Sequence, residues 1–133
     1  MISVVIPVYN EEGNVIPLHT ELKEVLSSLS QKYEIIFIDD GSTDNTLVNL
    51  LSLLEEGEKN LRVIQLRKRF EKSAALVAGF RLTEGDIIIT LDGDGQDDPQ
   101  NIPHLLEMLT EDIDVVCGWR YNRKDFRDRC FDR

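Results

Sequence analysis

The chain has 133 residues, enough for one domain that buries about two-thirds of the surface its unfolded chain exposes. It carries 25 acidic and 15 basic side chains, and a formal net charge of -10 argues against binding to nucleic acid phosphates. No apolar run approaches the roughly 20 residues that cross a bilayer, and residues 1–7 lack the marks of a signal peptide. The two cysteines, Cys117 and Cys130, lack metal-site spacing, so we expect reduced thiols in a cytoplasmic protein.

Apolar runs of strand length alternate with helical patterns along the chain. The expected strands are Ile2–Val8, Glu34–Ile38, Leu61–Leu66, Asp86–Leu91 and Asp114–Cys117. The helical patterns cover residues 15–29, 47–54, 74–82 and 102–109. This alternation, with nearly continuous apolar strands, predicts an α/β fold of three layers, a mostly parallel sheet covered by helices on both faces.

Local signals refine the expected helices. Asn14 is placed to cap the first helix. The short side chains of residues 74–82 suit a closely packed third helix. The apolar stripe of the second helix consists of Leu47, Leu50, Leu51 and Leu54.

Polar segments follow every expected strand. They are Pro7–Glu12, Asp39–Asp44, Arg67–Lys72, Asp92–Asp98 and Gly118–Arg120. Ligands of open parallel sheets bind beyond the carboxyl ends of the strands. We therefore expect these five segments to meet at one edge of the sheet and to contain the functional site.

The strongest chemical signal is the acidic segment that follows the fourth strand. It offers oxygen donors from Asp92, Asp94, Gln96, Asp97 and Asp98. Clustered carboxylates repel one another unless a cation neutralises them. Oxygen ligands suit a hard divalent ion, so the segment predicts a site for Mg²⁺ or Mn²⁺.

The acidic segment also resembles three other kinds of structure. Capping of the next helix by Asp97 or Asp98 is compatible with a metal site. A calcium-binding EF-hand loop is excluded, because positions six and twelve from Asp92 hold Asp97 and Pro103 instead of glycine and glutamate. A phosphatase that uses an aspartate nucleophile also places Asp-x-Asp after an apolar strand, and it stays open as a minor alternative.

The remaining strand ends offer weaker signals. A carboxylate at Asp39 or Asp40 can accept hydrogen bonds from a base or from ribose, and Tyr9 can stack on a base while Glu11 hydrogen-bonds to it. No glycine-rich dinucleotide motif or Walker lysine follows the first strand. The basic segment 67–72 suits either phosphate contact or a solvated loop.

Taken together, these strings resemble inverting family 2 glycosyltransferases with the GT-A fold, a Rossmann-like fold of nucleotide-diphospho-sugar transferases. The branch they resemble includes dolichyl-phosphate mannose synthase and bacterial polyprenyl-phosphate glycosyltransferases. The strings that carry the resemblance are Val5–Glu12, Asp39–Asp44, Ser73–Phe80, Asp92–Pro99 and Gly118–Arg120 with Arg123 and Asp125. One departure is Glu71, which stands where relatives often have glycine and puts the usual conformation of that loop in question.

The resemblance assigns roles to the donor-binding residues. It implies that Pro7, Tyr9 and Glu11 hold the nucleoside, with Asp39 on the base and Asp40 in the same cofactor-binding set. The donor is expected to be a UDP- or GDP-hexose.

The resemblance also assigns roles to the acidic segment. Asp92 lies by the ribose or the sugar, and Asp94 and Gln96 ligate the metal that bridges the diphosphate. Asp97 or Asp98 approaches the sugar or the acceptor, and Arg120 contacts the acceptor phosphate or the donor diphosphate. The expected catalytic set is Asp92, Asp94, Asp97, Asp98 and Arg120.

The resemblance predicts transfer of a hexose to a polyprenyl phosphate, with the alternative of a nucleotide-sugar-binding fragment without turnover. We expect residues 1–133 to be the donor-binding part of a catalytic domain that is truncated at its C-terminus. The basic segment 120–133 suits contact with an anionic membrane surface, which places the full-length protein at the cytoplasmic face of a membrane. A homo-oligomer is left open.

Overall fold

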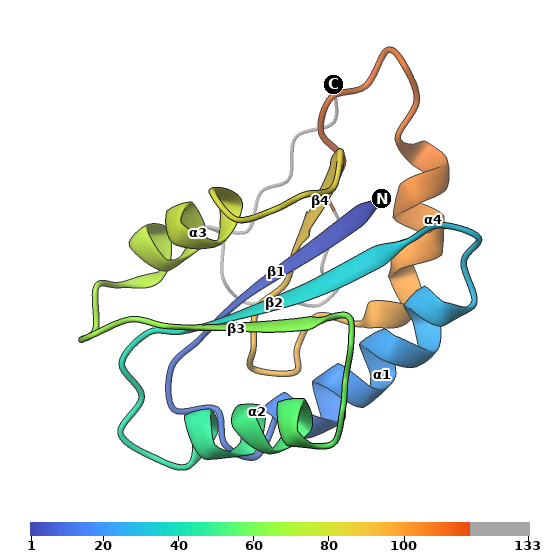
Figure 1. Cartoon of the computed structure of the whole chain (residues 1–133). Coiled ribbons are helices and arrows are strands. Elements are labelled where there is room, and N and C mark those ends of the chain that lie inside the picture. Colours follow the sequence, from blue (N-terminus) through green and yellow to red (C-terminus); the bar gives the residue numbers. More distant parts are fainter. Residues whose placement is uncertain (118–133) are drawn as a thin grey trace. The chain divides into compact units, whose positions relative to one another are not determined.

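The structure, a computed structural model, describes residues 1–117 (Figure 1). A first compact unit spans Met1–Asp97, and a second begins at Asp98. The first unit contains β1 (Ile2–Val8), α1 (Val15–Ser27), β2 (Tyr33–Asp39), α2 (Thr46–Glu55), β3 (Leu61–Gln65), α3 (Lys72–Phe80) and β4 (Ile87–Thr90). The described part of the second unit contains the short 3-10 helix η1 (Pro99–Asn101) and α4 (Ile102–Met108).

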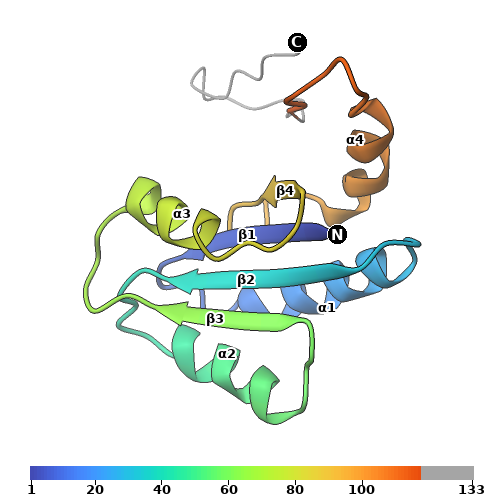
Figure 2. The ribbon, with the colours of Figure 1, turned by 45° about the horizontal axis from the view of Figure 1, so that its top comes forward.

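The four strands of the first unit form one parallel sheet in the order β3-β2-β1-β4. In the register, Val5 of β1 lies between Ile36 of β2 and Thr90 of β4. Helix α3 lies on one face of this sheet, and α1 and α2 lie on the other (Figure 2). The predicted three-layer α/β arrangement is confirmed.

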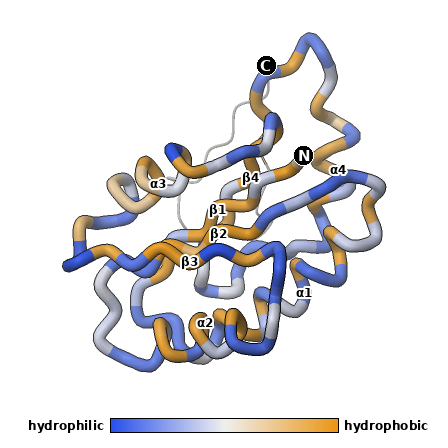
Figure 3. Tube along the Cα trace, in the orientation of Figure 1, coloured by the Kyte–Doolittle hydropathy of each residue, from blue (hydrophilic) through white to orange (hydrophobic). Residues whose placement is uncertain are grey.

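The core explains why the strands form. All seven residues of β1 are buried, and so are six of the seven residues of β2. Hydrophobic residues concentrate in the strands at the centre of the sheet, and hydrophilic residues line the surrounding loops (Figure 3). The predicted close packing of α3 is confirmed at Gly79, where a Cβ would lie 2.6 Å from Val5 Cγ1 and 2.8 Å from Ile38 Cδ1.

The predicted fifth strand is wrong. Residues 114–117 have no strand conformation. Within residues 1–117, β4 pairs with β1 and with no second neighbour. Only three residues of this segment, Val115, Val116 and Cys117, are apolar, and so short an apolar run signals a strand only weakly.

Two details of the predicted helices also need correction. Asn14 stands at the N-cap of α1, but its side chain makes no capping bond and instead donates to Glu11 Oε2 at 2.7 Å. In α2, Leu50 and Leu53 are buried while Leu51 and Leu54 are exposed. The buried face of α2 therefore differs from the predicted apolar stripe. Helix α2 packs on both α1 and β3, and periodicity alone does not determine which face of a helix turns inward. No helix among residues 1–117 is long and apolar enough to cross a membrane.

Candidate functional site

The strand order creates a natural binding place. The chain builds outward from β1 to β3 and then returns to place β4 on the other side of β1. Ligands of such sheets bind at the carboxyl ends of the strands where the direction reverses. A cleft of about 310 Å³ lies there, at the low end of the usual size of small-molecule sites. Its lining residues are Pro7, Val8, Tyr9, Glu11, Asp40, Arg69, Glu71, Lys72, Asp92, Gly93 and Asp94.

Six of the residues predicted from the sequence line this cleft. They are Pro7, Tyr9, Glu11, Asp40, Asp92 and Asp94. They come from three segments that are far apart in the sequence, at the ends of β1, β2 and β4. The expectation that these strand ends meet at one edge is confirmed for the described residues. Arg120 lies outside the described residues.

The loop after β4 is organised by its own carboxylates. Asp97 Oδ2 accepts a hydrogen bond from the Asp92 backbone N–H at 2.8 Å, and Asp94 Oδ1 accepts one from the Gln96 N–H at 2.9 Å. Neither Gln96 nor Asp97 lines the cleft. Asp98, the first residue of the second unit, caps η1 through the Gln100 N–H at 2.9 Å, as the capping interpretation predicts.

Gly93 brings the ends of β1 and β4 together. A Cβ at Gly93 would lie 2.4 Å from Val8 Cγ1 and 3.3 Å from the carbonyl oxygen of Pro7. Any side chain there would force the two strand ends apart. The glycine between Asp92 and Asp94 therefore keeps both carboxylates beside β1.

The two aspartates after β2 have different surroundings. Asp39 is 2% exposed, and its Oδ1 accepts the Ser42 N–H at 3.3 Å. It is not among the residues that line the cleft, so its expected contact with a base stays a prediction. Asp40 is 3% exposed, lines the cleft and accepts the Phe70 N–H at 2.8 Å. Asp40 thus anchors the segment that follows β3 to the end of β2.

Five further residues line the cleft. Two are Val8 and Gly93, and the other three, Arg69, Glu71 and Lys72, belong to the basic segment for which the sequence left open phosphate contact or a solvated loop. The guanidinium carbon of Arg69 lies 4.0 Å from the centre of the Tyr9 ring, and Lys72 Nζ contacts Asp92 Oδ1. Glu71 forms an ion pair of 3.7 Å with Arg69. In the sequence, the basic segment 67–72 was the only sign that these residues belong to the site. Until the fold was known, a solvated loop explained the segment equally well.

Glu71 has a backbone conformation that favours glycine. Its φ is 80° and its ψ is 162°, a combination that costs a residue with a side chain about 1–3 kcal/mol. The loop therefore keeps a backbone conformation suited to glycine although a glutamate stands at this position. The Glu71 side chain places a carboxylate at the wall of the cleft.

The lining residues carry five acidic and two basic side chains. Residues 1–117 contain no group of three or more His, Cys, Asp or Glu side chains that could hold a metal ion by themselves. Mg²⁺ and Mn²⁺ sites that bind phosphorylated ligands need only one or two protein oxygens, because phosphate oxygens and water complete the shell. The exposed Asp94 carboxylate uses one oxygen in the bond from Gln96, so the donor set at Asp94 fits such an ion.

Comparison with known proteins identifies the family. Residues 3–133 match the model of Glycosyl transferase family 2. The chain belongs to this family. A curated relative, dodecaprenyl-phosphate galacturonate synthase of Rhizobium johnstonii, is 40% identical over 93% of the chain and 37% of its own length. Undecaprenyl-phosphate 4-deoxy-4-formamido-L-arabinose transferase of Aeromonas hydrophila is 42% identical over 94% of the chain and 38% of its own length. The chain thus spans less than two-fifths of either relative.

A solved glycosyltransferase structure has a similar fold. The mannosyltransferase of Pyrobaculum calidifontis, in complex with GDP-Man and Mn²⁺, matches with a TM-score of 0.57 and 26% identity. The match covers 70% of this chain and 27% of that one. The fold of the first unit is therefore that of the GT-A glycosyltransferases, as the sequence motifs predict.

Proposed function

We propose that this chain is the donor-binding part of the catalytic domain of an inverting glycosyltransferase, which transfers a hexose from a nucleotide sugar to a polyprenyl phosphate. The observation that carries the proposal is the acidic cleft at the junction of β1 and β4, where residues that follow all four strands converge. Family membership and two polyprenyl-phosphate transferases among the relatives support it.

The nucleoside side of the cleft is formed by the ends of β1 and β2. In this proposal Tyr9 stacks on the base, and Pro7 and Glu11 complete the nucleoside site. Asp40 and Asp39 belong to the same set, Asp40 at the wall of the cleft and Asp39 in the turn behind it. The donor carries UDP or GDP.

The diphosphate side is formed by the loop after β4. Asp92 lies by the ribose or the sugar, and Asp94 and Gln96 hold Mg²⁺ or Mn²⁺. The ion supplies positive charge that stabilises the leaving nucleoside diphosphate. Because five of the lining side chains are acidic, an anionic donor needs such a cation. The Pyrobaculum enzyme was solved with Mn²⁺ and GDP-Man, which supports this assignment.

The acceptor side lies toward the end of the chain. Asp97 or Asp98 approaches the sugar or the acceptor, and Arg120 contacts a phosphate of the acceptor or the donor. A polyprenyl phosphate is already ionised near neutral pH, so its oxygen needs little help from a general base. The basic segment 120–133 meets an anionic membrane surface, at the cytoplasmic face of a membrane in the full-length protein, and homo-oligomers remain an additional proposal.

Calorimetry of nucleoside diphosphates tests the donor site. UDP and GDP are titrated with and without Mn²⁺ into the wild type, Asp94→Ala and Asp86→Ala. Asp86 is the matched control, because its exposed carboxylate pairs with the N-terminal ammonium outside the cleft. We expect Mn²⁺-dependent binding of one nucleotide, weakened more than tenfold by Asp94→Ala and unchanged by Asp86→Ala. Metal-independent binding, or equal binding by the two variants, contradicts the proposed site.

Turnover is a separate question. The alternative of a binding fragment predicts nucleotide binding without donor hydrolysis and without transfer to a short polyprenyl phosphate. The phosphatase alternative predicts release of phosphate from simple phosphomonoesters, and the family comparison gives it no support.

A further inference from the structure

The loop between β1 and α1 contains a residue with a rare backbone conformation. Asn10 has a φ of 51°, in the left-handed region. It stands between Tyr9 and Glu11, which both line the cleft. Asn10 itself does not line the cleft, so its conformation calls for another explanation.

The side chain of Asn10 accepts three hydrogen bonds from the loop that follows β2. Its Oδ1 accepts from the Thr43 N–H at 2.8 Å, from Thr43 Oγ1 at 3.3 Å and from the Asp44 N–H at 3.3 Å. The Asn10 N–H donates in turn to Ser42 Oγ at 2.9 Å. The partners lie 32 to 34 residues away in the sequence, so one residue ties the ends of two neighbouring strands together.

Further bonds extend this connection on the C-terminal side of Asn10. The Glu11 N–H donates to Thr46 Oγ1 at 2.8 Å, and Glu12 Oε2 accepts the Asn45 N–H at 3.0 Å. Asp44 Oδ1 also accepts hydrogen bonds from the N–H and the hydroxyl of Thr46. Burial would raise the pKa of Asp44, but these bonds outweigh it and lower the pKa. Both loops are thus held in one fixed geometry, with Asn10 at the side nearest Tyr9.

Few residues could replace Asn10. A left-handed backbone favours glycine, asparagine and aspartate. Only asparagine and aspartate add a side-chain oxygen that can accept from two backbone N–H groups and a hydroxyl at once. Position 10 therefore requires a residue that tolerates the left-handed backbone and also has a side-chain oxygen that accepts hydrogen bonds.

We propose that Asn10 is a positioning residue of the donor site: by fixing the loop after β1 to the loop after β2, it orients Tyr9 and Glu11 toward the nucleoside. This inference rests on the proposed function. It predicts that Asn10 controls the affinity for the nucleoside part of the donor and leaves the binding of the diphosphate and its metal ion unchanged.

Two substitutions separate the backbone from the side chain. Asn10→Gly keeps the left-handed conformation and removes the acceptor oxygen, whereas Asn10→Asp keeps both. Asn60→Gly is the control for a glycine placed in an exposed loop far from the cleft. The Kd values of UDP, GDP and pyrophosphate are measured with Mn²⁺ for each protein, together with the Tm and the amide exchange rates of Thr43 and Asp44.

We expect Asn10→Gly to weaken nucleoside diphosphate binding about tenfold, which corresponds to the loss of one or two net hydrogen bonds. The amide exchange rates of Thr43 and Asp44 should both increase. Pyrophosphate binding should stay the same, and Asn10→Asp should bind within about threefold of the wild type. The inference is overturned if Asn10→Gly binds nucleoside diphosphates as tightly as the wild type does. It is also overturned if Asn10→Asp loses as much nucleoside diphosphate affinity as Asn10→Gly, or if Asn10→Gly weakens pyrophosphate binding to the same extent. If the wild type binds no nucleoside diphosphate, the proposed function fails first, and the inference fails with it.

Discussion

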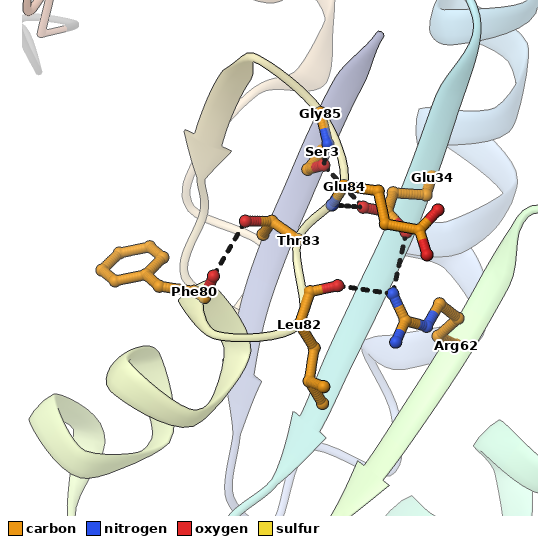
Figure 4. Close-up of polar contacts among 8 residues, drawn as sticks. All are labelled: Ser3, Glu34, Arg62, Phe80, Leu82, Thr83, Glu84 and Gly85. Carbon is orange, nitrogen blue, oxygen red and sulfur yellow. Dashed lines mark hydrogen bonds and ion pairs between the residues drawn. The ribbon is translucent and has the colours of Figure 1, made fainter.

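At the amino ends of the strands, opposite the cleft, a buried carboxylate connects three strands and the loop before β4 (Figure 4). Glu34 of β2 is 5% exposed. It accepts hydrogen bonds from Ser3 Oγ at 2.6 Å, from the Glu84 N–H at 2.7 Å and from Arg62 Nη1 at 3.1 Å. We predict that Glu34→Ala strongly destabilises the chain, because the substitution leaves these donors without their acceptor.

The size of the effect follows from the surroundings of each donor. The Ser3 hydroxyl is buried and the Glu84 N–H is partly buried, and a donor left unsatisfied in such a place costs about 1–3 kcal/mol. Arg62 is 39% exposed, can turn to water and adds less than about 1 kcal/mol. The free energy of unfolding should therefore fall by about 3 kcal/mol, which lowers the Tm by roughly 10 °C for a chain of this size.

Urea and thermal denaturation of three variants test this reasoning. Glu34→Gln should cost only about 1 kcal/mol, because its amide oxygen still accepts hydrogen bonds from Ser3 and Glu84. The control is Glu58→Ala, which removes a surface ion pair of 2.8 Å with Lys23 and should cost less than about 1 kcal/mol. If Glu34→Ala is no more destabilising than Glu58→Ala, the buried network does not stabilise the fold as argued.

The same carboxylate predicts a pH dependence. Burial would raise the pKa of Glu34, but the hydrogen bonds from Glu84, Ser3 and Arg62 outweigh it and hold the pKa below its ordinary value. The folded pKa is thus lower than the unfolded one, so the stabilisation is present above the unfolded pKa and is lost as the pH falls through the folded pKa. The stability difference between wild type and Glu34→Gln should therefore shrink below pH 4.5, and a difference that grows in acid contradicts this sign.

Two further predictions concern the start of α3, at Lys72 and at Glu71 directly before it. Lys72→Gln removes the cation that contacts Asp92, so the Mn²⁺ affinity of the nucleotide-free protein should rise about fivefold. Paramagnetic titration measures this affinity. Lys68→Gln is the control, because Lys68 lies over the Phe70 ring and does not line the cleft. Equal Mn²⁺ affinity in Lys72→Gln and Lys68→Gln contradicts the competition. Glu71→Gly should raise the free energy of unfolding by about 1 kcal/mol, because the backbone strain that is released exceeds the added conformational entropy of glycine in the unfolded chain. Glu71→Ala should not raise it. A lower free energy of unfolding in Glu71→Gly shows that the backbone at Glu71 is unstrained.

The sequence predicted the fold where local pattern was sufficient. The bounds of β1 are those expected, because a segment of seven residues in which only Ser3 is polar has few alternatives to a buried strand. Residues 114–117 show the opposite case, since a short run depends on a partner strand that local pattern does not reveal. The acidic segment after β4 could be predicted because its four aspartates lie within residues 92–98.

Residues whose partners are distant in sequence were missed. Glu34 was counted only as the start of a strand, yet its partners lie 28 to 50 residues away. Asn10 stands between two residues that were assigned to the site and was passed over, because its hydrogen bonds reach a loop more than 30 residues later. For Arg69 and Lys72 the sequence left phosphate contact and a solvated loop equally open, and only the fold, in which β3 pairs with β2, showed that they line the cleft. Contacts of this kind depend on topology, and a single sequence does not specify them.

The two sides of the cleft are held by different forces, and this difference makes the proposed roles separable. On the β1–β2 side, several hydrogen bonds between loops fix the residues assigned to the nucleoside. On the β4 side, the close approach of Gly93 to Val8 and the Lys72 contact hold Asp92, while Asp94 stays exposed at the rim. A cation that enters with the donor diphosphate can therefore reach Asp94 without rearranging the nucleoside loops. Substitutions at Asn10 should then weaken the binding of nucleoside diphosphates and leave the binding of pyrophosphate unchanged, whereas Asp94→Ala should weaken the Mn²⁺-dependent binding of both. If substitutions at Asn10 and Asp94 affect the two ligands in the same way, the two sides act as one unit and this division of roles is wrong.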